Sequence, residues 1–301
     1  MFRTFVVPLD GTPQAAAAIP IARTLARTTQ ATLVLVRVAP EGDVSGEPER
    51  YVQAVARQLD GLSVRCAVRH GRPAREVLAA AADEQADVIV MATHGRVGLP
   101  RVLAGSVSES VLAASRVPVL LVRPGGKRVT RLQTLLVPTD GTAGAALALG
   151  AAVGLARISG ARLELIQAVE PVPTWVYGSD YDSEPPYIDP ALEEENLEAA
   201  QIYVDGIAER LRAAGLCAHA QARVGRAVAT IETVADETDT DVIVMSTHAL
   251  TGPVRTLLGS TADALVRTAR RPVLLVRRPG GHFDDQNAPD MDTLVADATA
   301  S

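Results

Sequence analysis

Hydrophobic residues occur along the chain in short continuous runs, and segments with helical spacing separate them. In the first half, the apolar runs are 4–9, 32–39, 87–92 and 118–123, and an alternating run occupies 62–69. The intervening pattern predicts helices over 13–29, near 50–60, and over 73–85 and 105–115. Apolar strands that alternate with helices are typical of a parallel sheet with both faces covered. We therefore predict an α/β fold with a doubly wound parallel sheet.

The second half repeats this pattern. VPLDGT at 7–12 returns as VPTDGT at 137–142, VIVMATHG at 88–95 as VIVMSTHA at 242–249, and PVLLVR occurs at 118–123 and 272–277. Asp10 and Asp140 are 130 residues apart, whereas His94 and His248 are 154 apart, so the second copy has 154 − 130 = 24 extra residues near its start. We predict two tandem domains, 1–126 and 131–278, each with a five-stranded sheet in the order 3-2-1-4-5.

Two segments fall outside this repeat. The extra residues predict an insertion at 170–190, which holds the only Trp and three of the five Tyr. A Pro-rich loop with aromatic residues is either an ordinary surface loop or a lid or contact for a partner. Residues 279–301 are acidic and mostly lack periodicity, and we expect them to form a disordered tail.

Composition excludes several classes of function. The net charge is −6, lysine occurs only at Lys127, and the arginines are scattered along the sequence. A nucleic-acid-binding protein usually has a basic face. The longest run of small apolar residues, 143–156, is shorter than the ~20 residues of a membrane span. The N-terminus runs into a strand without signal-peptide features, and two distant cysteines fit a reduced compartment. We expect a cytoplasmic protein that binds neither nucleic acid nor membrane.

Candidate chemistry gathers at the carboxyl ends of strands one and four, where ligands bind in open α/β sheets. Strand one ends at Asp10, strand four at Thr93 and His94, and the next helix begins at Gly105 and Ser106. Free N–H groups and the helix dipole favour an anion at such a helix start. A Ser N-cap with turn glycines, and an Asx-turn at Asp10, are the alternative interpretations, and the sequence leaves both open. No Walker loop, nucleophile elbow or catalytic triad is present.

These motifs resemble the universal stress protein family. Both halves have P-x-D at the first strand, and the first has T-H-G-R-x-G…G-S after the fourth, so that the resemblance covers about 1–124 and 132–278. The ATP-binding branch of that family has the pattern G-x2-G-x9-G-S/T. The first half matches it at Gly95, Gly105 and Ser106, with Ala92 at the first glycine. In the second half Ser246 and Ala249 replace two glycines, and Gly259 and Ser260 match.

The resemblance implies ATP, with Mg²⁺ held through Asp10 or Asp140 as an option and no confident metal site. Phosphates would lie on the 92–98 loop, the ribose near Asp10 and the adenine beside Val38. The implied first-half contacts are Pro8, Asp10, Val38, Ala92, Thr93, His94, Gly95, Arg96, Gly98, Gly105, Ser106, Val107 and Ser108. The second-half contacts are Pro138, Asp140, Ala168, Ser246, Gly252, Gly259, Ser260 and Thr261. Since alanine is costly at positive φ, Ala249 predicts weaker binding in the second half.

The function that the resemblance implies is a stress-response module that binds ATP and signals through its nucleotide state, with little or no catalysis. A nucleotide-free interaction scaffold that uses the 170–190 loop is the alternative, and a slow ATPase is a weaker one. Family members pair through the fifth strand. The resemblance therefore implies an intramolecular pseudo-dimer through 118–123 and 272–277, and leaves further homodimerisation open.

Overall fold

The computed structural model describes residues 2–93, 106–171, 189–247 and 259–276. We call the part up to Arg123 the first lobe and the part from Thr134 onward the second lobe. The first-lobe strands are β1 (Thr4–Leu9), β2 (Thr32–Ala39), β3 (Val64–His70), β4 (Val88–Ala92) and β5 (Val119–Val122). The second-lobe strands are β6 (Thr134–Pro138), β7 (Arg162–Val169), β8 (Ala218–Val224), β9 (Val242–Ser246) and β10 (Val273–Val276).

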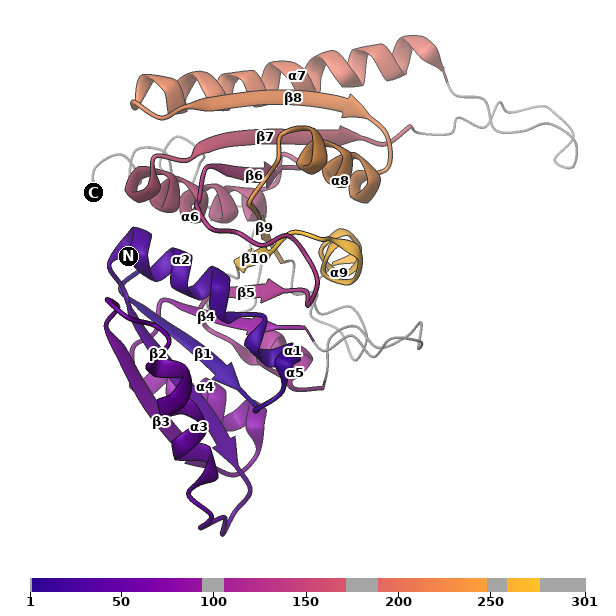
Figure 1. Ribbon diagram of the computed structural model, residues 1–301. Helices are drawn as coiled ribbons and strands as arrows, with labels where there is room; N and C mark the ends of the chain where they lie inside the picture. The colour runs from indigo at the N-terminus through magenta and orange to yellow at the C-terminus, as the bar shows by residue number, and fades with distance from the viewer. Residues whose placement is uncertain (1, 94–105, 172–188, 248–258, 277–301) are drawn as a thin grey trace, which may run out of the picture.

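All these strands belong to one sheet, in the order β3-β2-β1-β4-β5-β10-β9-β6-β7-β8 (Figure 1). Each half of that list is the predicted 3-2-1-4-5 order, so the α/β class and the strand order are confirmed. Every pairing within a lobe is parallel, and the single antiparallel pairing among the described strands joins β5 to β10. The two five-stranded sheets are therefore one continuous ten-stranded sheet.

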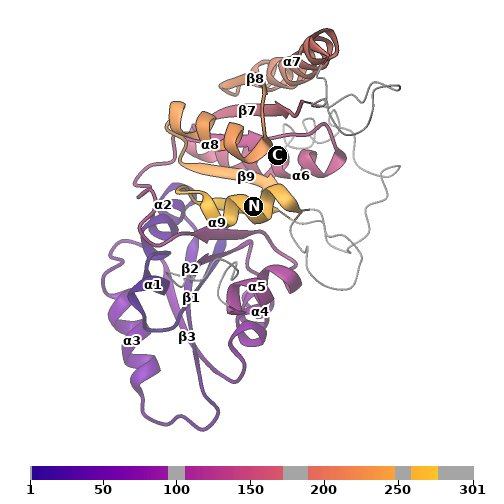
Figure 2. The ribbon, with the colours of Figure 1, turned by 90° about the vertical axis from the view of Figure 1, so that its right-hand side faces the viewer.

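Helices cover both faces of the sheet, as the continuous apolar strands require. The helices are α1 (Pro13–Ala16), α2 (Ile19–Thr29), α3 (Glu47–Ala56), α4 (Pro73–Asp83), α5 (Ser106–Ala114), α6 (Ala143–Ser159), α7 (Pro190–Ala213), α8 (Ala227–Glu237) and α9 (Ser260–Thr268). One core contains buried residues of α2, α3, α6 and α7, and the other contains those of α4, α5, α8 and α9. Figure 2 shows α3 and α4 on opposite sides of the first-lobe strands.

The predicted helix over 13–29 is divided into α1 and α2. Pro20 lies in the first turn of α2, where its missing N–H costs nothing, but its ring excludes an uninterrupted helix through the preceding turn. Ala17 and Ala18 instead make short-range bonds to the carbonyls of Gln14 and Ala15. The break follows from proline chemistry that the apolar periodicity concealed.

The two lobes are joined by more than the β5–β10 pairing. Leu120 and Leu274 are paired in register and are 1% and 2% exposed, so apolar side chains fill the junction. Arg123 Nη1 donates to the carbonyls of Arg267 at 2.7 Å and Thr268 at 3.0 Å. Pairing the two apolar edges removes the exposed strands that each lobe alone would present.

The extra length of the second copy lies partly in a helix. Helix α7 has 24 residues and its counterpart α3 has 10, so α7 is 24 − 10 = 14 residues longer. The Asp189 carboxylate caps it by accepting from the Ala191 N–H at 3.0 Å. Most of the predicted insertion at 170–190 lies outside the described residues, as does the predicted tail at 279–301.

Candidate functional site

The strand order of each lobe reverses between its first and fourth strands. The paired positions of these strands end at Val6–Ile89 in the first lobe and at Leu136–Ile243 in the second, two residues before the proline of each P-x-D motif. Proline has no N–H to contribute to a ladder. The carboxyl ends therefore separate at the topological switch point, where ligands bind in this class of sheet.

In the second lobe the separated strands lead into a pocket of about 420 Å³. Its lining includes the ends of three strands and the first turn of α9. Seven residues predicted for this lobe line it: Pro138, Asp140, Ala168, Ser246, Gly259, Ser260 and Thr261. The eighth, Gly252, lies outside the described residues. The structure thus brings the described members of the predicted set together around one cavity.

The start of α9 forms the polar end of this pocket. Gly259 precedes the helix with φ +78° and ψ 152°, and no side chain caps the first turn. That φ favours glycine, and a Cβ built there would have no neighbour within 4 Å. The first-turn amides of α9 have no intrahelical acceptor, and Gly259 at the N-cap has no side chain to cap them. The residues of this turn, Ser260 to Ala262, line the pocket. This is the geometry in which a helix start binds an anion.

The other walls of the pocket are largely apolar. Ile166 and Ala168 of β7, Ile231 of α8, and Met245 of β9 line it. None of its described lining residues is an arginine or a lysine. An anion in this pocket would therefore be bound by backbone amides and hydroxyl groups, and an apolar ring would fit the opposite wall. Sequence reasoning missed Ile231 because it lies on a helix that carries no motif.

Asp10 and Asp140 each form the same local turn. Asp10 Oδ1 accepts from the backbone N–H of Thr12 at 2.9 Å and from its hydroxyl at 2.6 Å. Asp140 Oδ1 accepts from Thr142 in the same way, at 3.0 Å and 2.6 Å. The Asx-turn is thus present in both lobes. Both carboxylates are on exposed residues, and that of Asp140 lines the pocket.

A tyrosine accompanies each of these aspartates, and the sequence analysis did not identify either. Burial raises the pKa of Tyr203 of α7, and the nearby Asp140 raises it further, against a hydrogen bond with Thr139. Burial likewise raises the pKa of Tyr51 of α3, and Asp10 contributes in the same direction. The two tyrosines are 203 − 51 = 152 residues apart, close to the repeat offset. That spacing, in a chain with five tyrosines, is the signal that could have identified them.

The first-lobe residues are described only in part. Pro8 and Asp10 lie at the end of β1, Val38 is half-buried in β2, and Ala92 ends β4. Thr93 is buried and its N–H donates to the Val122 carbonyl at 2.8 Å. In the first turn of α5, Ser108 is buried and Val107 half-buried, and Ser106 begins the helix. The remaining predicted contacts, His94, Gly95, Arg96, Gly98 and Gly105, lie outside the described residues.

The described residues also bear on metal binding and on membrane insertion. No group of three or more His, Cys, Asp or Glu side chains among the described residues is arranged to hold a metal ion. No helix in the described parts of the chain is long and apolar enough to cross a membrane.

Comparison with known proteins identifies the family. The profile of the universal stress protein family matches residues 1–123 and 131–277, and the chain belongs to this family. A universal stress protein of Thermus aquaticus is 37% identical over 137 residues, which are 41% of this chain and 100% of the relative. The universal stress protein Rv2005c of Mycobacterium tuberculosis is 32% identical over 133 residues, 39% of this chain and 44% of the relative.

Solved structures support the fold of the whole chain. A universal stress protein from Archaeoglobus fulgidus superimposes with a TM-score of 0.71 at 20% identity, covering 92% of this chain and 99% of that one. A Pseudomonas aeruginosa protein that is assigned to the universal stress proteins superimposes with a TM-score of 0.64 at 19% identity. The match covers 99% of this chain and 97% of that one. At this identity the likeness shows the fold alone, including the tandem arrangement of two lobes.

Proposed function

We propose that the second-lobe pocket binds an adenine nucleotide, with ATP as the preferred ligand, and that the chain acts as a nucleotide-dependent regulatory module in a stress response. The observation that carries this proposal is the convergence of seven predicted residues on one cavity beside an uncapped helix start. Membership of the universal stress protein family supports the biological setting.

The residues of the pocket suggest how the ligand is held. The phosphates would accept from the amides of the first turn of α9 and from the hydroxyls of Ser260 and Thr261. The adenine would lie on the apolar wall that includes Ala168 and Ile231. Asp140 would accept from the ribose hydroxyls or assist a Mg²⁺ ion that the phosphates bring with them. The same roles fall to Asp10, Val38 and the start of α5 in the first lobe.

We propose binding with little or no hydrolysis. Asp140 is the only carboxylate among the described residues of the pocket, and its Oδ1 already accepts two hydrogen bonds from Thr142. A carboxylate so occupied is a weak general base for activating water. We further propose that the β5–β10 pairing makes the chain its own internal dimer, and that the domains extend over 1–126 and 131–278. Cytoplasmic localisation remains an expectation from the sequence.

The direct experiment asks whether the purified protein carries or binds nucleotide. After denaturation, released adenine nucleotide is measured by absorbance and retention time, and Mg-ATP is then titrated into nucleotide-free protein. At ~100 times its dissociation constant, ATP should raise the free energy of unfolding by ~2.7 kcal/mol. Neither released nucleotide nor a thermal shift would contradict the proposal and favour the nucleotide-free scaffold. Release of inorganic phosphate from ATP, measured over hours, then distinguishes a protein that binds ATP without hydrolysis from a slow ATPase.

A matched pair of variants localises the binding. Thr261→Asp adds a carboxylate to the first turn of α9, where it suits the helix dipole but repels phosphate. Leu192→Asp adds the same charge to the first turn of α7, outside the pocket. ATP affinity should fall in Thr261→Asp and stay unchanged in Leu192→Asp, with both proteins folded by circular dichroism. Equal ATP affinity in the two variants and the wild type would show that ATP does not bind in this pocket.

A further inference from the structure

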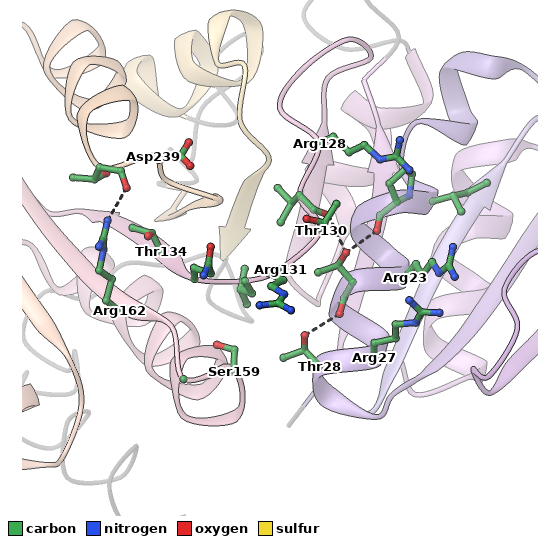
Figure 3. Close-up of a pocket in the computed structure, with 18 of the residues that line it drawn as sticks. Arg23, Arg27, Thr28, Arg128, Thr130, Arg131, Thr134, Ser159, Arg162 and Asp239 are labelled. Carbon is green, nitrogen blue, oxygen red and sulfur yellow. Dashed lines mark hydrogen bonds between the residues drawn. The ribbon is translucent and has the colours of Figure 1, made fainter.

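A second large cavity among the described residues lies away from the proposed nucleotide pocket. It is a groove of about 960 Å³ between the lobes (Figure 3). One face of α2 lines it on one side, the segment 128–133 crosses it, and the amino ends of β6 and β7 line the other side. The nucleotide pocket is instead at the carboxyl ends of the second-lobe strands. The two cavities are therefore at opposite ends of that half of the sheet.

The charge of this groove is opposite to that of the whole chain. Its described lining contains one carboxylate, Asp239, which is already ion-paired with Lys127 at 2.7 Å. Its arginines are Arg23, Arg27, Arg128, Arg131 and Arg162. The chain as a whole has a net charge of −6. A concave surface with several guanidinium groups concentrates a positive potential, because the walls focus the field into the cavity.

Most of these arginines have no internal partner. Arg162 is held at the far wall, where it donates to the Thr238 carbonyl at 2.8 Å and pairs with Glu164 at 3.1 Å. Arg23, Arg27, Arg128 and Arg131 make no hydrogen bond or ion pair with the described chain. The carboxyl end of a helix attracts cations: Arg162 donates to the C-cap carbonyl of α8, and Arg27 is in the last turn of α2. The four unpaired guanidinium groups are left for an external anion.

The arrangement of Arg23 and Arg27 is electrostatically unfavourable in the absence of a ligand. They are four residues apart on α2, so that they project from the same side of the helix, as Figure 3 shows. Like charges at this spacing repel each other. The Nε of Arg23 is also buried without a hydrogen-bond partner. Arg128 lines the same groove, and Arg131 extends into the space between the lobes. A bound anion would relieve the repulsion between the two guanidinium groups.

We propose that this groove binds a small oligophosphate, recognised by its phosphoryl groups and without its base. Planar guanidinium groups donate in pairs to phosphate oxygens, and several neighbouring arginines match several linked phosphates. No described lining residue of the groove is aromatic, so no aromatic ring there offers a base the stacking surface that single-strand binders use. Thr130 adds a hydroxyl donor. This site is separate from the proposed nucleotide pocket and does not depend on it.

The test uses inorganic tripolyphosphate as the probe, titrated calorimetrically into the whole chain at ~0.15 M ionic strength. Arg23→Gln/Arg27→Gln should weaken binding by ~10-fold or more, because each lost charged hydrogen bond is worth ~1.5–3 kcal/mol. Arg75→Gln/Arg116→Gln removes the same charge from exposed positions outside the groove. It should change the affinity less than twofold by the same reasoning, since distant exposed charges are screened. A second double variant, Arg128→Gln/Arg131→Gln, keeps the test possible if Arg23→Gln/Arg27→Gln does not fold. It should weaken tripolyphosphate binding to a similar extent.

The outcomes separate this site from the nucleotide site. ATP affinity should be unchanged in Arg23→Gln/Arg27→Gln, and tripolyphosphate affinity should be unchanged in Thr261→Asp. No tripolyphosphate binding by the wild type, or equal losses in the groove and control pairs, would overturn the proposal. Loss of tripolyphosphate binding in Thr261→Asp alone would also overturn it, because the probe would then lie at the start of α9. Absence of ATP binding throughout would reject the nucleotide proposal and leave this one standing.

Discussion

The side chain of Lys127, the only lysine in the chain, lies 2.9 Å from Asp241 Oδ1. The same Nζ donates to the carbonyls of Asp239 at 2.7 Å and Thr240 at 3.1 Å. Asp241 Oδ2 in turn accepts from the backbone of Gln133 at 2.7 Å and Thr134 at 3.1 Å. The lysine therefore connects the segment between the lobes to the end of α8 and the start of β6.

The aspartate of this cluster, Asp241, has a counterpart in the first lobe. Asp87, 154 residues before Asp241, accepts from the backbone of Arg3 at 2.6 Å and Thr4 at 3.0 Å. Each aspartate thus caps the amino end of the first strand of its lobe. Only Asp241 has a lysine beside it, since Lys127 belongs to the segment that is not duplicated.

Removal of the Lys127 amine should destabilise the protein. Asp241 has a side chain only 9% exposed, and Lys127→Ala leaves it without its cation. We expect the free energy of unfolding to fall by about 1–3 kcal/mol, the usual cost of an unsatisfied buried polar group. Urea denaturation measures it, and Arg116→Ala, which removes an exposed cation, is the control. An equal midpoint for Lys127→Ala and the wild type would show that the cluster contributes nothing.

Stability should decrease at acid pH through Asp239. Its hydrogen bond with Lys127, and then the charge of Lys127, hold the pKa of this carboxyl below its ordinary value of 3.8. A carboxyl whose pKa is lowered by folding stabilises the folded state above its unfolded pKa, and that contribution disappears as the pH falls through the folded pKa. Asp239→Asn should therefore lower the urea midpoint at pH 7, and the difference from the wild type should shrink as the pH falls below 3.8. Parallel midpoint curves for the two proteins between pH 7 and pH 3 would refute this assignment.

Gly126 should not tolerate a side chain. A Cβ there would overlap the Arg270 carbonyl oxygen and approach the Arg123 carbonyl to 3.0 Å, and both are backbone atoms that cannot rotate away. Gly126→Ala should destabilise the protein by about 1–3 kcal/mol through overpacking. Gly125, with φ +78° and no atom within 4 Å of a built Cβ, is the matched control. Its alanine variant has only the backbone strain of about 1–2 kcal/mol, so the overlap at Gly126 is measured as any further fall in the urea midpoint, and equal midpoints would contradict it.

Gly259 should matter for ligand binding beyond its backbone conformation. Gly259 has φ +78° and Gly215 has φ +81°, and a Cβ at either would have no neighbour within 4 Å. Alanine should therefore cost about 1–2 kcal/mol of stability at each position. Only Gly259→Ala places a methyl group beside the start of α9, where we expect ATP affinity to fall by ~10-fold, or about 1.4 kcal/mol. If both variants bind ATP like the wild type, backbone approach at Gly259 is not part of recognition.

The sequence alone determined the α/β class, the duplication and the strand order within each lobe. Those conclusions rest on local patterns: short apolar runs such as 118–123 fix where strands occur, and the repeat of VPLDGT fixes the domain plan. The residues around the second-lobe pocket were also accessible, because strand ends and a helix start converge at a switch point in this topology. Periodicity did not reveal the break at Pro20 or the long helix α7, whose extra turns have no counterpart in the first copy.

Only the tertiary structure decided how distant charges meet. The arginines look scattered along the chain, yet the turn of α2 at Arg23 and Arg27 and the segment at Arg128 and Arg131 enclose one groove. The pairing of β5 with β10 brings these segments, about a hundred residues apart in sequence, to the same boundary between the lobes. Such a cluster cannot be predicted from local sequence, because the density of charge in space depends on how the two lobes pack.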